Sequence, residues 1–159
     1  MPHKIPYNSI LQSRDIAVLR CLFDCRVATT LHLSRLYFKG SSEAAKMRVQ
    51  NLKRSKFIIE RSRRAYEPAI HSLTAKGLKI LTDQGALVAY SKTPVGSLSK
   101  RAQVSESTVR HELEVMDVRV AFHVALQKDT GVELKNSPPG LCSLNSWRGN
   151  QVFLTGQSW

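Results

Sequence analysis

Apolar residues recur at helical spacing in three consecutive stretches of the first third of the chain. Recurrence every three or four residues is typical of amphipathic helices that turn one face toward a core. The apolar positions are Ile16, Leu19, Leu22 and Phe23 in residues 9–25, Leu33, Leu36 and Tyr37 in residues 28–38, and Ala45, Val49 and Leu52 in residues 43–54. We therefore predict three helices, with Gly40 and a cap at Ser41 or Ser42 between the second and the third.

The following segment changes from helical to strand-like character. Residues 57–61 (F-I-I-E-R) combine β-branched side chains with outward charges, which predicts a strand. Residues 61–68 (R-S-R-R-A-Y-E-P) read as a basic turn, and residues 69–73 can return as the partner strand. Thr74 is then a suitable N-cap for a fourth helix that ends at Gly85.

The second half of the chain predicts one long helix. Residues 91–104 contain Ser, Pro and Gly without sustained periodicity, which predicts a linker. The helix then runs from a cap at Ser105 or Ser107 to about Lys128, and one of its faces has apolar residues near a 3.5-residue period. These residues are Val109, Leu113, Met116, Val120 and Val124. The remainder, with P-P-G and two tryptophans, predicts an irregular tail.

The order of these elements is that of a winged helix-turn-helix. We expect a mainly α fold with a small β-hairpin wing, followed by a long C-terminal helix. The expected parts are a winged domain at 9–90, a linker at 91–104, the long helix at 105–130 and the tail at 131–159.

The long helix has two interpretations. It can fold back on the winged domain, or it can pair with its copy in a second chain. We favour a homodimer formed by the five apolar positions above, because a second strip of Val118, Phe122, Ala125 and Leu126 doubles the apolar face.

Charge narrows the range of partners. The 159 residues have a net charge of +12, of which +10 falls in residues 1–90 and +7 in residues 46–64. Eight basic side chains face one Glu in that last segment, and five of the eight are Arg, which pairs well with phosphate and guanine. The pattern favours double-stranded DNA as the partner.

Composition excludes other classes of protein. The chain has no apolar run near the roughly 20 residues of a membrane helix and no secretory signal at its N-terminus. Three cysteines fit a reducing compartment, so we expect a cytoplasmic protein. Cys21 and Cys25 are expected to be buried small side chains rather than a redox pair.

The two most basic elements supply the candidate DNA contacts. The helix at about 42–55 would enter the major groove, where Lys46, Gln50 and Lys53 can reach base edges or phosphates. Arg48 lies nearer the core stripe and can reach a phosphate or pack by its stem. The wing at 61–68 would lie on the backbone or in the minor groove. The full candidate set is Ser42, Lys46, Arg48, Gln50, Lys53, Arg54, Arg61, Arg63 and Arg64.

Two motifs carry a resemblance. The run S-S-E-A-A-K-M-R-V-Q-N-L-K-R-S-K-F-I-I-E-R resembles the recognition helix and wing of winged-helix regulators, with Lys56 in place of the usual glycine. The runs S-L-T-A-K-G-L-K-I-L and V-R-H-E-L-E-V-M-D-V-R-V-A-F are similar to the replication-relaxation family of plasmid and mobile-element proteins. The resemblance spans about residues 10–130 and implies DNA binding that regulates plasmid replication or transcription.

Catalysis is the alternative class. Glu133-Leu134-Lys135 has the E-x-K form of metal-dependent nucleases, for which Asp117 or Asp129 could supply an earlier carboxylate. A third possibility is a basic adaptor for an acidic protein. We expect no enzyme and no cofactor, and the spacing of His32, His71, His111 and His123 suggests no metal site.

Overall fold

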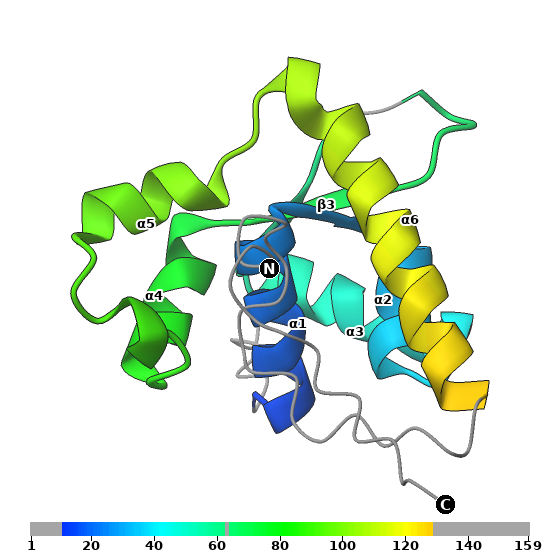
Figure 1. Cartoon of the computed structure of the whole chain (residues 1–159), viewed down its shortest axis with the longest axis horizontal. Helices are drawn as coiled ribbons and strands as arrows, with labels where there is room; N and C mark the ends of the chain where they lie inside the picture. Colours follow the sequence, from blue (N-terminus) through cyan, green and yellow to red (C-terminus); the bar gives the residue numbers. More distant parts are fainter. Residues whose placement is uncertain (1–10, 63, 129–159) are drawn as a thin grey trace, which may run out of the picture.

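The computed structural model describes residues 11–62 and 64–128 (Figure 1). Its elements are α1 (Ser13–Cys25), β1 (Val27–Thr29), α2 (Thr30–Tyr37), α3 (Ser42–Arg54), β2 (Ile58–Glu60), β3 (Ile70–Leu73), α4 (Ala75–Asp83), the 3-10 turn η1 (Val88–Tyr90), α5 (Val95–Ala102) and α6 (Glu106–Lys128). The predicted fold class is confirmed, because the chain is mainly helical with a small antiparallel sheet and a long C-terminal helix. In these residues no helix is both long and apolar enough to cross a membrane.

The sheet has three strands, in the order β1-β3-β2, and both pairings are antiparallel. The hairpin of β2 and β3 was expected from the sequence. In the structure Ile58 lies opposite Leu73. Strand β1 was not expected. It has three residues, all of them buried, and therefore shows no alternation of apolar and polar side chains that a sequence pattern could reveal. Arg26, at φ 66°, makes the turn from α1 into this strand.

Side-chain caps begin α2, α3 and α4, and those of α3 and α4 are as the sequence predicts. The hydroxyl of Thr29 accepts from the His32 amide, Ser41 accepts from the Ala44 amide, and Thr74 accepts from the Gly77 amide. Gln12 is the N-cap of α1, and its amide donates to the carboxylate of Asp15 at 2.7 Å.

The core lies around α1, which has α4 and α5 on one side and α2 and α6 on the other (Figure 1). Leu19, Leu22 and Phe23 of α1 are completely buried. Gly77 allows α4 to approach β2 closely, because a Cβ atom at this position would lie 2.3 Å from the carbonyl oxygen of Phe57. Any side chain here would push α4 away from the sheet.

The prediction of an irregular linker at 91–104 is wrong, because this segment contains α5. Leu98 and Ala102, four residues apart, are buried and join α5 to the core. The guanidinium of Arg101 lies over the ring of Tyr90, 5.2 Å from its centroid, which adds a cation–π contact. Eight residues with only two buried apolar positions leave little periodicity to detect.

Helix α6 folds back along β1 and α2 of the same chain. Val109, Met116 and Val120 of the predicted dimer seam are buried inside the protomer, while Leu113 and Val124 are half-buried. The seam residues therefore serve intramolecular packing, and the assignment of this face to a dimer is wrong. The outer strip is exposed instead, with Val118 71% and Phe122 58% accessible.

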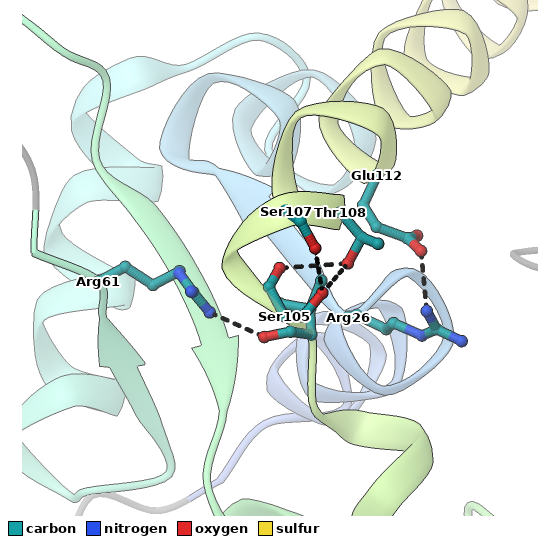
Figure 2. A network of polar contacts seen from close by, with 7 residues as sticks. Arg26, Arg61, Ser105, Ser107, Thr108 and Glu112 are labelled. Atoms are coloured by element: carbon teal, nitrogen blue, oxygen red, sulfur yellow. Dashed lines mark hydrogen bonds and ion pairs between the residues drawn. The ribbon is translucent and has the colours of Figure 1, made fainter.

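Polar contacts hold α6 at successive points along its length, and Figure 2 shows those near its N-terminal end. They join Glu106 to Arg61, Glu112 to Arg26 at 2.9 Å, Asp117 to His32 at 2.9 Å, and Arg119 to Sγ of Cys25 at 3.0 Å. Because Nδ1 of His32 accepts from the Thr29 amide, its Nε2 has the proton that is donated to Asp117. The cap of α2 is thereby coupled to α6.

The contact of Arg119 involves a buried thiol pair. Cys21 and Cys25 are free and buried, as expected. The hydrogen bond with Cys25 lowers the pKa of the Cys21 thiol to about 6 against the effect of burial, and the charge of Arg119 contributes in the same direction. The guanidinium of Arg119 donates to Sγ of Cys25, whose own pKa is raised by the hydrogen bond with Cys21 and by burial.

We expect Met116→Ala to lower the free energy of unfolding by about 3 kcal/mol, because a completely buried side chain would leave a cavity. The matched control, Val118→Ala on the exposed face, should change it by less than roughly 0.5 kcal/mol. Urea denaturation monitored by circular dichroism measures both. Equal, small effects would show that α6 does not pack against its own chain.

Candidate nucleic-acid interface

A sharp turn joins α2 to α3. Lys39 and Gly40 both have positive φ, at 51° and 81°, and the Gly40 amide donates to the Ser34 carbonyl oxygen at 2.9 Å. Glycine adopts this backbone conformation without steric cost, which suits the sharp reversal of the chain. The hydroxyl of Ser41 then starts α3.

Helix α3 has one buried and one exposed face. Ala45, Val49 and Leu52 are buried, as the apolar spacing predicts. At about 100° per residue, Met47 and Arg54 lie about 200° and 180° around the helix from Ala45, directly opposite the core. The exposed side chains of this helix are Ser42, Glu43, Ala44, Lys46, Met47, Gln50 and Arg54. Four of the predicted contact residues, Ser42, Lys46, Gln50 and Arg54, thus share one surface.

Two lysines of the candidate set have acidic neighbours. Lys46 Nζ lies 3.0 Å from Glu43 Oε1, and both side chains are largely exposed. Lys53 points to the side, toward Glu60 of β2, and is less exposed. Ion pairs at the surface contribute only about 0–1 kcal/mol, so a phosphate can compete for either ammonium group.

Arg48 faces inward. Its guanidinium donates through Nε and Nη2 to the carboxylate of Asp15, whose side chain is completely buried. The same carboxylate accepts from the Gln12 amide at the start of α1. The structure therefore places Arg48 in the attachment of α3 to α1 and away from the exposed face that holds Gln50.

The wing, the loop between β2 and β3, projects beside the N-terminal end of α6 (Figure 1). Arg61 reaches from the base of this loop to Glu106 and to the Val104 carbonyl oxygen (Figure 2). Its guanidinium is thus part of the α6 attachment. Arg64 is exposed, and its Nη1 donates to the Tyr66 hydroxyl at 3.1 Å. Arg63 lies outside the described residues.

Two exposed side chains of this surface were not in the predicted set. Met47 is 62% exposed in the middle of the outward face of α3, and Tyr66 is 78% exposed in the wing. Both lie in the basic segments from which DNA binding is predicted. An apolar or aromatic residue among the cations could have identified them, whereas charge alone does not.

A family model described as replication-relaxation matches residues 19–153, which is most of the chain. The chain belongs to the replication-relaxation family. The match includes α2, α3, the wing and α6, and it continues beyond the last residue that the structure describes. Membership in the replication-relaxation family suggests a role in the replication or relaxation of a plasmid or mobile element. No curated protein and no solved structure matches this chain.

Most of the residues of the nuclease alternative lie outside the part of the chain that the structure describes. Glu133, Lys135 and Asp129 lie outside the described residues. Asp117, the other candidate carboxylate, pairs with His32. In residues 11–62 and 64–128 no three His, Cys, Asp or Glu side chains cluster in a way that could hold a metal ion.

The position of Arg48 gives a test that separates stability from binding. Arg48→Ala should lower the free energy of unfolding by about 3 kcal/mol, because it leaves the buried Asp15 carboxylate without this partner. Gln50→Ala, two residues further on the exposed face, should change it by less than roughly 0.5 kcal/mol. Chemical denaturation of both variants measures this difference. An unchanged stability for Arg48→Ala would return Arg48 to the set of surface contacts.

Proposed function

We propose that this protein binds duplex DNA sequence-specifically and regulates plasmid or mobile-element replication or transcription. In this proposal α2, the turn and α3 form a helix-turn-helix, and the loop between β2 and β3 is the wing. One observation carries the proposal: α3 buries a narrow stripe and presents Lys46, Gln50 and Arg54 together on its opposite face. Family membership supports a role in DNA metabolism.

The dimensions of α3 suit the major groove. Its 13 residues extend about 20 Å, and the groove of B-DNA is about 12 Å wide, enough to admit a helix. Gln50 can pair with the N6 and N7 atoms of adenine, and Lys46 can reach guanine or a phosphate. Arg54, at the last turn, is suited to a backbone phosphate.

The wing supplies a second, less specific contact. Arg64 and Tyr66 are exposed at its tip, where a guanidinium can neutralise a phosphate and a ring can pack against sugar or base. Arg61 is held by Glu106 and supports the base of the wing. This division assigns base recognition to α3 and sequence-independent affinity to the tip of the wing.

Binding without catalysis is the function we favour. Asp117, one of the two carboxylates that the nuclease alternative could use, is joined to His32 in the attachment of α6. An adaptor for an acidic protein would also use a basic surface, but it gives no reason for a glutamine between two cations on a helix of groove size.

A homodimer remains a prediction and requires a different surface from the one first expected. Val118, Ala121, Phe122 and Ala125 are exposed on the outer side of α6. We propose that this strip, rather than the buried seam, is where two copies would meet. A monomer in sedimentation experiments at tens of micromolar protein would contradict the dimer.

The binding proposal is tested with duplexes selected from a random library by the full chain at 100 mM salt. Gln50→Ala should reduce the preference for the selected duplex over a random one about tenfold and keep the residual affinity. Arg64→Ala should weaken all duplexes alike and lower the slope of log K against log salt by about one unit.

Lys79→Ala is the charge-matched control, because Lys79 lies on α4 and pairs with Asp83 outside α3 and the wing. It should leave affinity, preference and salt slope unchanged. If no duplex is enriched, the DNA proposal fails and the adaptor alternative takes its place. Equal effects of Gln50→Ala and Arg64→Ala would show that helix and wing have been given the wrong roles.

A further inference from the structure

We propose that Met47 is a specificity-determining residue that recognises the C5-methyl group of a thymine in the major groove. This inference rests on the proposed function and adds an apolar contact to it. It starts from an exposed side chain that neither the core of the fold nor the charge of the surface explains.

Met47 lies in the middle of the exposed face of α3, directly opposite the buried stripe. Within α3, every residue of which the structure describes, it is the one large apolar side chain that is exposed. It is the sixth residue of the helix and falls in its N-terminal half, the part of a recognition helix that reaches base edges. Lys46 and Gln50 lie on the same exposed surface, both on one side of Met47, about 100° and 60° around the helix from it.

The surroundings of Met47 favour a base over a protein as its partner. A docking surface for a protein presents several neighbouring apolar side chains, as the outer strip of α6 does with Val118 and Phe122. On α3, by contrast, the small Ala44 is the one other exposed apolar side chain near Met47. The remaining exposed side chains include Glu43 together with Lys46, Gln50 and Arg54, which are suited to phosphates and base edges. In the major groove the one apolar group that distinguishes a base is the thymine methyl.

The chemistry of methionine fits this contact. Its unbranched, polarizable thioether can adapt to a methyl group whose position varies with the local shape of the groove. Burial of one methyl group between them would strengthen binding about fourfold, the equivalent of roughly 0.8 kcal/mol. Gln50 lies near Met47 on the same face of α3. When Gln50 pairs with an adenine, the thymine of that base pair or of an adjacent A·T or T·A pair would be within reach of Met47.

Replacement of thymine by deoxyuridine tests the inference, because it removes only the C5-methyl group. We would select duplexes with the full chain, substitute each thymine of the selected site in turn, and measure Kd by fluorescence anisotropy. One or two positions should bind the wild type about fourfold more weakly after substitution. Met47→Ala should bind thymine and uracil duplexes equally, and Met47→Leu should retain the difference, since Leu has similar volume.

Val95→Ala is the matched control, because it truncates an apolar side chain of similar exposure on α5. It should retain the full discrimination between thymine and uracil. If the wild type binds every uracil duplex as tightly as the thymine duplex, the inference is wrong and the DNA proposal still stands. Discrimination that persists in Met47→Ala assigns the contact to another residue. If no duplex is selected at all, the inference and the proposed function both fail.

Discussion

The buried carboxylate of Asp15 is the constraint on which the position of α3 depends. It accepts from the Gln12 amide, which begins α1, and from the guanidinium of Arg48, which lies on α3. One charged group therefore fixes the start of the central helix and the rotation of α3 about its own axis. Since a buried charge is costly without its partner, the two helices are held in one relative arrangement. Arg48 is turned inward beside the buried apolar stripe of α3, and Met47, Gln50 and Arg54 are exposed on the other side of the helix.

The contacts that attach α6 to the rest of the protein pair further basic side chains. Arg26 and Arg61 pair with glutamates of α6, and Arg119 of α6 meets the thiols of α1. Together with Arg48, these internal pairs remove four cations from the exposed basic surface, which includes Lys76 and Lys79 of α4 besides α3 and the wing. The net charge of +12 therefore overstates the positive surface of the protein.

Local patterns and long-range contacts differ in how far the sequence predicts them. The buried stripe of α3 and the cap at Ser41 follow from residues a few positions apart, and the structure has both. Strand β1 and helix α5 are too short to produce a periodic signal. The roles of Arg48 and Arg61 depend on partners 33 and 45 positions away in the chain. Patterns of residue spacing do not predict contacts over such distances. The same limit applies to α6, whose apolar face fits a dimer seam and an intramolecular core equally well.

The central claim is that the exposed face of α3 and the tip of the wing bind duplex DNA. Titration of the ¹⁵N-labelled full chain with a selected duplex, followed by two-dimensional NMR, tests it most directly. We predict the largest amide shifts in residues 42–54 and 64–68, with small shifts along the outer side of α6. Shifts centred on α6, or shifts that do not distinguish α3 from the rest of the chain, would contradict this assignment.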